Sequence, residues 1–168
     1  MLKESLEKLT LEKQIEFLRG AYFGVDGVWF LVCEDEYGPD TALQLDTEVW
    51  RRFAGILAKR VKRMFGVGGE DTETVVDTIG LRWTMENWEF EVPECSPERS
   101  VMRVRRCPWL EGLKRSNRES FASRICGPVC ETVYRAWSQT INPKIKLERP
   151  KRLGRGDECC EFVYTLEE

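Results

Sequence analysis

The sequence predicts an α+β domain in which N-terminal helices precede an antiparallel sheet of two hairpins, interleaved with two helices. Apolar residues recur at helical spacing through most of residues 1–86, whereas apolar and polar residues alternate at 88–92 and 101–107, and two further strands are expected near 145–152 and 159–165. A run of helices followed by such strands is typical of α+β proteins. With 168 residues, 42% of them hydrophobic, we expect one domain over 1–168, with a helical part at about 1–86 and a cysteine-containing α+β part at about 87–168.

Four helices are expected in the first half. Leu11, Ile15 and Leu18 predict the first. Asp26 is a suitable N-cap for a second, whose apolar residues 28–32 indicate a path through the core and which ends at Gly38-Pro39. The third begins at Asp40, ends at Gly66–Gly69, and carries one apolar stripe: Ala42, Leu45, Val49, Phe53, Ile56, Leu57, Val61 and Met64. The fourth begins at Asp71.

The second half combines strands and short helices. A turn at 93–97 predicts a hairpin between the first two strands. Ser116 and Glu119 form a capping-box pattern, which predicts a short helix that ends near Cys126. A further helix with Cys130, Val133, Tyr134, Trp137 and Ile141 on one face ends at Asn142-Pro143, and a turn at 154–157 joins the last two strands.

The composition excludes several kinds of chemistry. The chain has seven cysteines and no histidine, so a Ser-His-Asp triad, a Cys-His pair and a histidine-bound zinc are impossible. The charged N-terminus does not resemble a signal peptide, and no apolar run approaches the roughly 18 residues that span a membrane. We therefore expect a cytoplasmic protein that does not enter the membrane, with cysteines that are buried, reactive or metal-binding rather than disulfide-bonded.

The charges are unevenly distributed. Residues 99–155 carry far more Lys and Arg than Asp and Glu, whereas 1–98 are acidic. The net charge of −3 favours pairing of the two segments within the domain. The alternative is nucleic-acid binding through the basic segment and its aromatic residues. We do not expect nucleic acid as a partner, because no motif supports it and those aromatics fall on apolar faces: Trp109, Phe121, Tyr134 and Trp137.

Five of the seven cysteines lie near the ends of predicted elements. Cys33, in an apolar helix, is expected to be a core residue, and Cys95, in a turn, has no partner at metal-ligand spacing. Cys159 and Cys160 are consecutive on a strand, so only one is expected to point inward. A thiolate set could bind zinc tetrahedrally, or an iron–sulfur cluster: Cys107, Cys126, Cys130 and Cys160. Without a CxxC motif, buried structural thiols remain the alternative, and Glu34 and Glu131 are the carboxylates that could assist a metal site.

Several C-terminal motifs resemble known families. Cys107-Pro108-Trp109, the Cys126/Cys130 region, Asn142-Pro143 and Leu153-x-x-Gly156-Asp157-x-x-Cys160-x-Phe162 are similar to L-2-amino-thiazoline-4-carboxylate hydrolase-like proteins. The Gly-Asp-x-x-Cys-x-Phe ending also resembles the 4-vinyl reductase family of small-molecule-binding domains. Over about residues 20–165 the chain resembles an uncharacterised prokaryotic family through Asp26-Gly-x-Trp29-Phe-Leu, Glu34-x-Glu36-x-Gly38 and Trp50.

The resemblance to vinyl-reductase-type domains implies an α+β fold, a homodimer and a small apolar or heterocyclic ligand. Some of these domains hold zinc with cysteines and a glutamate, using a Glu-x-x-Cys segment for which this chain has Arg149 and Arg152. Cys160 carries over, and Cys107 and Cys126 match cysteines of the uncharacterised family. The fourth ligand is open between Cys130, Cys159 and Glu34.

Two functions follow as expectations. The first is a small-molecule-binding protein with a cysteine-ligated, structural zinc, in which aromatics line an apolar pocket or simply form the core: Trp29, Trp50, Tyr134 and Trp137. The second is a hydrolase of a small heterocycle or amide that uses a metal-bound water with Glu34 or Glu131, or a cysteine thiolate. A site closed by four thiolates favours the first, and the sequence does not identify the ligand.

Overall fold

The computed structural model describes residues 6–167. The chain divides into two compact units, the first reaching Leu43 and the second beginning at Gln44. Helix α2 (Leu11–Tyr37) makes up most of the first unit, and helix α3 (Pro39–Phe65) begins there and continues into the second. All the strands belong to the second unit, which also contains the cysteines from Cys95 onward.

Helix α2 is one continuous helix, where the sequence predicted two. The side chain of Thr10 caps it by accepting a hydrogen bond from the backbone N–H of Lys13, and it ends at Gly38, whose φ of 79° suits glycine. The predicted N-cap Asp26 therefore lies inside a helix, because no proline interrupts the chain there and single glycines are tolerated. The expected path through the core is also wrong: Val28 is 62% exposed and Val32 55%.

Helix α3 ends at Phe65, before Gly66 with a φ of 66°, as predicted. Its buried line is different from the predicted stripe, because Val49, Ile56 and Met64 are exposed. The buried apolar residues of the α3 segment that lies in the second unit are Trp50, Ala54, Ala58 and Val61, of which the predicted stripe contained only Val61. Small residues at successive turns let a helix approach its neighbours closely. A stripe defined by large apolar residues does not identify such a line of alanines.

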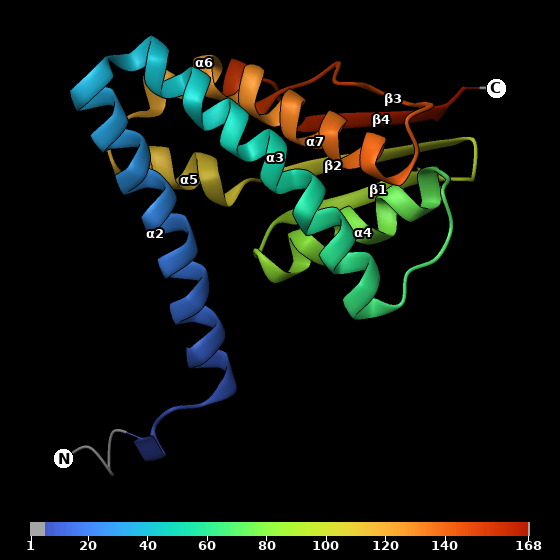
Figure 1. Ribbon diagram of the computed structural model, residues 1–168, viewed down its shortest axis with the longest axis horizontal. Helices are drawn as coiled ribbons and strands as arrows, with labels where there is room; N and C mark the ends of the chain where they lie inside the picture. The colour runs from blue at the N-terminus through green and yellow to red at the C-terminus, as the bar shows by residue number, and fades with distance from the viewer. Residues whose placement is uncertain (1–5, 168) are drawn as a thin grey trace. The chain divides into compact units, whose positions relative to one another are not determined.

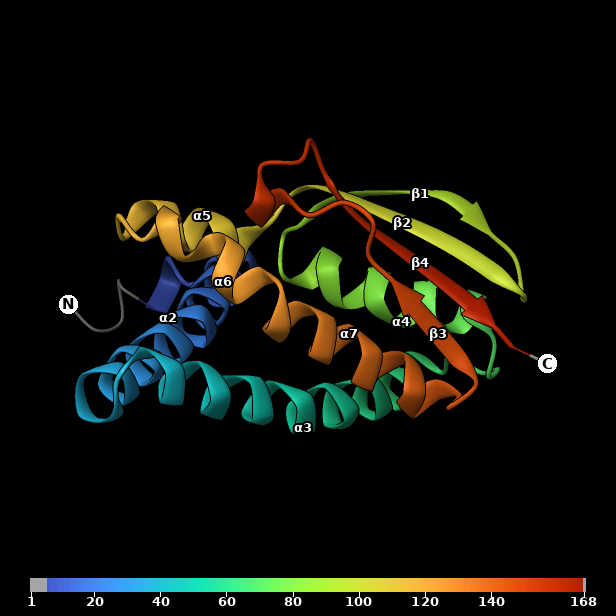
Figure 2. The same cartoon turned by 90° about the horizontal axis from the view of Figure 1, so that it is seen from above.

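Helix α4 (Thr72–Met85) begins where it was predicted, since the Asp71 carboxylate accepts a hydrogen bond from the backbone N–H of Thr74 at 2.8 Å. The strands that follow form a four-stranded antiparallel sheet among the described residues, in the order β1-β2-β4-β3. Their bounds are Glu89–Cys95, Arg99–Arg106, Ile145–Glu148 and Cys160–Leu166 for β1 to β4. Figures 1 and 2 show α4 and helix α7 (Pro128–Ile141) on the same face of this sheet. The α+β prediction is confirmed.

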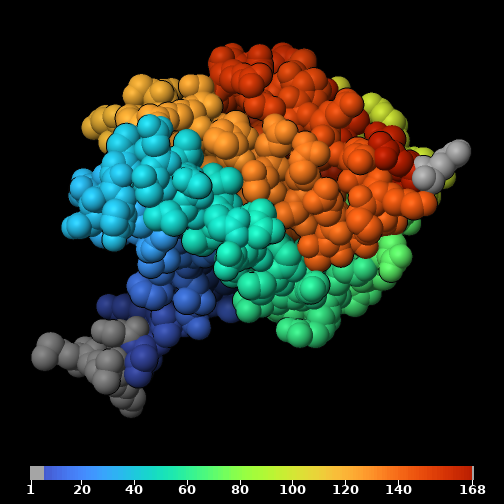
Figure 3. Space-filling view, turned by 45° about the horizontal axis from the view of Figure 1, so that its top comes forward, coloured from blue at the N-terminus to red at the C-terminus, as the bar shows by residue number. Residues whose placement is uncertain are grey.

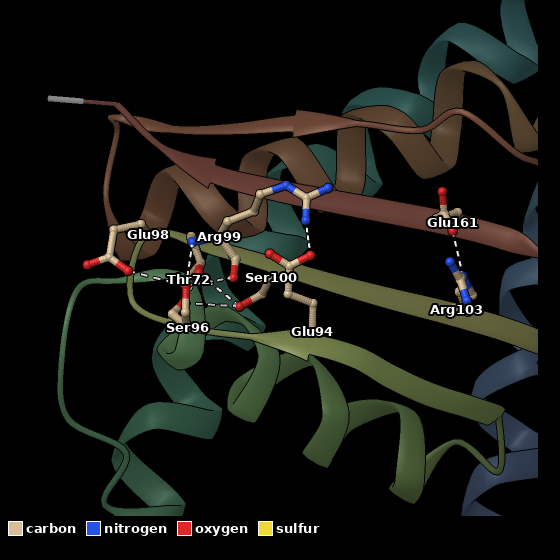
Figure 4. Close-up of polar contacts among 8 residues, drawn as sticks. All are labelled: Thr72, Glu94, Ser96, Glu98, Arg99, Ser100, Arg103 and Glu161. Carbon is tan, nitrogen blue, oxygen red and sulfur yellow. Dashed lines mark hydrogen bonds and ion pairs between the residues drawn. The ribbon is translucent and has the colours of Figure 1, made fainter.

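The turn between β1 and β2 is tied to the start of α4 (Figure 4). Thr72 Oγ1 lies 2.9 Å from Ser100 Oγ and donates to the carbonyl of Ser96. The sheet also joins acidic and basic residues, as the charge distribution predicted. In the described residues four ion pairs link its strands: Arg99–Glu94, Arg103–Glu161, Arg105–Glu91 and Arg106–Glu89.

The connection from β2 to α7 contains a helix that the sequence patterns missed. Helix α5 (Pro108–Arg115) begins with proline at its first position and buries Leu110, and the 3₁₀ turn η1 (Glu119–Phe121) and helix α6 (Ala122–Cys126) follow. The predicted N-cap Ser116 is instead the C-cap of α5, where its hydroxyl donates to the carbonyl of Gly112. A hydroxyl can cap either end of a helix, so the capping-box pattern misled the prediction.

Aromatic side chains form the core between the helices and the sheet. Trp83 of α4 is fully buried, and its indole N–H donates to the Tyr134 hydroxyl at 2.6 Å. The Trp83 ring also packs edge-on against Phe162 of β4, with ring centroids 5.3 Å apart. Tyr134 and Trp137 are 2% and 0% exposed, so they are core residues and neither can stack on a nucleic-acid base.

Candidate functional site

Four cysteines converge where the sheet meets α6 and α7. Cys107 follows β2 at the N-cap of α5, Cys126 is the last residue of α6, and Cys130 lies in the first turn of α7. Cys160 opens β4. The thiol of Cys126 hydrogen-bonds to Cys130, and electrostatic interactions link Cys130 with Cys107 and Cys160. The structure therefore brings together the four cysteines that the sequence singled out, which we call the cysteine cluster.

Local sequence features position these sulfur atoms. Gly127-Pro128 separates α6 from α7, so Cys126 and Cys130 come from two helices rather than one. The 3₁₀ turn η2 (Leu153–Arg155) packs on α6, and Figure 3 shows the C-terminal segment, in red, beside the orange helical segment. Gly154 lies so close to Cys126 that a Cβ added there would be 2.8 Å from its sulfur. In the same turn the backbone N–H of Leu153 donates to Cys160 Sγ at 3.2 Å.

Arg149 is the one charged side chain that hydrogen-bonds to a cluster sulfur in the described residues. It is 8% exposed, and its guanidinium packs over Phe162, 4.5 Å from the ring centroid. Nη1 donates to the carbonyl of Cys126 at 2.9 Å, and Nη2 lies 3.7 Å from Cys160 Sγ. No carboxylate of the described chain forms an ion pair with Arg149, and its buried Nε has no hydrogen-bond partner.

Sequence reasoning did not identify Arg149 as a site residue. It noted only that arginine stands where a zinc-binding relative has glutamate. A usable signal was present, because Ile145, Leu147 and Arg149 alternate with polar residues, and the structure buries all three. An arginine in the inward register of a strand pattern is rarely buried without a partner.

The cluster favours one thiolate. The pKa of Cys130 is lowered, first because the Cys126 thiol donates a hydrogen bond to it and also because the Arg149 and Arg82 guanidinium groups attract its negative charge. The same hydrogen bond and burial raise the pKa of Cys126. Burial is also the main cause of the raised pKa values of Cys107 and Cys160. Cys126 and Cys130 therefore titrate as a hydrogen-bonded pair, in which the pKa of Cys130 is lowered and that of Cys126 is raised.

The remaining candidates have other surroundings. Glu131 is held by Arg152 at 2.7 Å and by Arg135 at 3.0 Å. Cys159 is also buried, but it interacts electrostatically with Arg103 and Lys151 rather than with the cluster, so of the two consecutive cysteines only Cys160 joins the cluster. Glu34 lies on α2 in the first unit, as does Cys33, which is buried as predicted, and Cys95 is exposed.

The arrangement does not match a metal centre. Within residues 6–167 no three of the Cys, Asp and Glu side chains are arranged so that they could hold a metal ion. The donor set is chemically suitable, but a guanidinium already supplies a positive charge to the sulfur atoms, and a metal cation beside it would be repelled. Zinc or an iron–sulfur cluster at these cysteines therefore stays a sequence prediction.

The fold and the site together define an α+β protein with a histidine-free, thiol-based site. The family model for L-2-amino-thiazoline-4-carboxylic acid hydrolase matches residues 19–164. The chain belongs to this family, which confirms the resemblance that the C-terminal motifs indicated. No curated protein matches the chain.

A solved structure shares the fold. It is a trafficking protein particle complex subunit 3 from Naegleria fowleri, covalently bound to palmitic acid. The match has a TM-score of 0.60 and 13% identity, and it covers 91% of this chain and 97% of that one. At this identity the likeness concerns the fold alone. In addition, none of the helices between residues 6 and 167 combines the length and apolarity needed to cross a bilayer. The expected homodimer stays a prediction.

Proposed function

We propose that the chain binds a small molecule at the cysteine cluster and hydrolyses it with Cys130 as the nucleophile. One observation carries this proposal: the buried Arg149 guanidinium has no carboxylate partner and lies against the cluster sulfurs. A buried cation without a counter-ion is costly, and a thiolate beside it removes much of that cost. A thiolate is the nucleophilic form of cysteine, so this arrangement activates Cys130 without the histidine that other thiol hydrolases use.

The family supports a heterocyclic substrate. A 2-amino-thiazoline contains a carbon bonded to one sulfur and two nitrogens, which is an electrophile that a thiolate can attack. In this proposal the Cys130 sulfur adds to that carbon, the bond to the ring nitrogen breaks, and the nitrogen takes up a proton. Water then adds to the same carbon, the exocyclic nitrogen is retained, and Cys130 leaves as a thiolate. One water molecule is consumed and the ring is opened.

Hydrolysis of L-2-amino-thiazoline-4-carboxylic acid, followed by chromatography of the ring-opened product, tests this proposal. We expect turnover by the wild-type protein and none by Cys130→Ser, because a neutral hydroxyl cannot replace a thiolate here. Cys95→Ser is the matched control, since Cys95 is exposed on β1 and should not contribute. Equal turnover by Cys130→Ser and the wild type would refute the role of Cys130.

A second candidate is an acyl-chain-binding protein. The structural neighbour holds palmitic acid covalently, and this chain has a thiol with a lowered pKa in the same fold. Incubation with palmitoyl-CoA and intact-mass measurement distinguishes the two: a stable mass increase of one palmitoyl group that is absent in Cys130→Ser supports acyl binding. Absence of this increase, together with ring opening of the thiazoline, supports the hydrolase.

The zinc prediction has its own test. If Arg149 supplies the positive charge that the thiolate needs, anaerobically purified protein should contain far less than one equivalent of zinc or iron. Stoichiometric zinc that is lost in Cys107→Ser and Cys160→Ser would instead support the structural metal site.

A further inference from the structure

Arg149 retains hydrogen-bonding capacity that the protein itself does not use. A guanidinium has five N–H donors in a planar fork. Here one donor reaches the Cys126 carbonyl, another lies 3.7 Å from Cys160 Sγ, and the side chain also hydrogen-bonds to Cys130. The Nε donor is buried without a partner, although the side chain is 92% removed from solvent. A buried donor without an acceptor costs about 1–3 kcal/mol, and more when it is charged.

The neighbouring arginines differ from Arg149 in charge balance. Arg82 forms an ion pair with Glu86 at 2.8 Å, and Arg152 forms one with Glu131 at 2.7 Å. Arg149 alone among these three has no carboxylate. Its interactions with the cluster involve thiols: the pKa values of Cys107, Cys126 and Cys160 are raised, and the negative charge that faces Arg149 is that of Cys130.

The amino end of α7 lies beside the same sulfurs. This helix of 14 residues begins at Pro128, and no side chain caps its first turn, which contains Cys130. The positive end of a helix dipole favours an anion, and here it adds to the field of Arg149, whose Nη1 bonds to the residue just before the helix. A second unpartnered donor is close, because the fully buried Tyr164 hydroxyl has no hydrogen bond and interacts electrostatically with Arg149.

From these observations we propose that Arg149, together with the amino end of α7, forms a subsite that binds the carboxylate group of the ligand beside Cys130. This inference rests on the proposed function, because it takes Cys130 as the reacting thiol. A carboxylate suits the subsite since it carries one negative charge and two coplanar oxygens that match the guanidinium fork.

The subsite predicts a preference between two reagents that differ only in charge. Iodoacetate carries a carboxylate and iodoacetamide is its neutral counterpart, and both alkylate thiolates. We expect the ratio of their rates at Cys130, followed by peptide mass spectrometry, to be at least about tenfold higher than the ratio at the exposed Cys95, which serves as an internal reference. Arg149→Met should reduce the ratio to that of Cys95. Arg155→Met, which removes an exposed arginine from η2, should leave it unchanged.

Taking the ratio separates carboxylate recognition from thiol activation, because loss of Arg149 slows both reagents through the pKa of Cys130 but only the carboxylate also loses a partner. If Cys130 shows the same ratio as Cys95 in the wild type, the subsite is refuted while the proposed function stands. If Cys130 reacts with neither reagent, the proposed function fails, and the subsite is then decided by calorimetry alone.

Calorimetry also covers the case in which Arg149→Met does not fold, because it needs only the wild type and Cys130→Ser. The probes are thiazolidine-4-carboxylate and its neutral carboxamide. We expect the carboxylate to bind at least about tenfold more tightly than the amide to both proteins. Equal affinity, or no binding of either compound, overturns the carboxylate subsite.

Discussion

Gly154 offers the sharpest structural test of the cysteine cluster. Replacing it with alanine adds one methyl group, which would lie 2.7 Å from Cys126 Cβ, 2.8 Å from Cys126 Sγ and 2.9 Å from the carbonyl oxygen of Ala122. Ordinary carbon contacts fall at about 3.5–4.0 Å, so each of these distances is too short by a large fraction of an ångström. The carbonyl and the Cβ belong to the rigid part of α6, so a side-chain rotation cannot relieve them.

The expected cost follows from that overlap. Inserting a methyl group into a closely packed region typically costs about 1–3 kcal/mol, and three simultaneous contacts place Gly154→Ala in the upper part of this range. Gly112→Ala is the matched control, because Gly112 lies inside α5 and a Cβ there meets nothing within 4 Å. Alanine in a helix interior is favoured over glycine by roughly 0.5–1 kcal/mol, so the control should gain stability.

Urea unfolding followed by tryptophan fluorescence measures both variants. We expect a lower midpoint for Gly154→Ala and a higher one for Gly112→Ala, with equal slopes. Gly154→Ala should also slow alkylation of Cys130, because displacing Cys126 weakens the hydrogen bond that lowers the pKa of Cys130. If Gly154→Ala is as stable as the wild type and Cys130 reacts unchanged, the close packing of η2 on Cys126 is wrong, and the argument for a preformed site fails with it.

Three further predictions concern the core, a helix cap and the thiolate. Trp83→Phe should cost about 2–4 kcal/mol in urea unfolding, since it removes a buried hydrogen bond and leaves a cavity, whereas Trp29→Phe at a 38% exposed position should cost less than about 0.5 kcal/mol. Asp71→Ala should cost about 1 kcal/mol at pH 7. The hydrogen bond from the backbone N–H of Thr74 lowers the pKa of Asp71. The stabilisation by this cap is therefore present above the unfolded pKa of about 3.9 and is lost as the pH falls through the lower folded value. If Asp71→Ala is still less stable than the wild type at pH 2, this explanation is wrong. Alkylation of Cys130 should reach its half-maximal rate at a lower pH than alkylation of Cys95, and coincident pH profiles would refute the lowered pKa.

Local patterns predicted the elements whose ends carry strong signals. Asp71 and Gly66 mark helix ends, and they were predicted correctly. In β3 and β4 alternate residues are buried, whereas β1 is mostly exposed and continues to Cys95, into the turn predicted at 93–97. Asp26 and Ser116 failed because a residue that can cap a helix does so only where the chain stops being helical, and tertiary contacts decide where that happens. The sequence therefore indicated whether these segments are helices or strands, but it did not give several of their boundaries.

For the candidate site, too, features of the local sequence were predicted and features that depend on long-range contacts were not. The cysteines were found because they stand at element ends, which the pattern reveals. Arg149 was missed because its significance lies in a lack of partners, and a sequence does not show which carboxylates a fold will bring near. The absence of histidine narrowed the chemistry to sulfur but could not say how a thiol would be ionised.

In the proposed site, the buried Arg149 explains how a thiol is ionised without histidine, and it limits the proton transfers that are possible. A histidine can accept a proton from a thiol and later return it, whereas a guanidinium remains protonated at any working pH and can only stabilise negative charge. In the proposed hydrolysis, Cys130 would therefore have to lose its proton before the ligand arrives, and the proton that the leaving nitrogen needs would have to come from another group. Cys126 is the group in contact with Cys130, and its raised pKa means that it keeps a proton at neutral pH. In the proposed site, Cys130 is thus the nucleophile and Cys126 keeps its proton, because the different surroundings of the two sulfur atoms separate their pKa values.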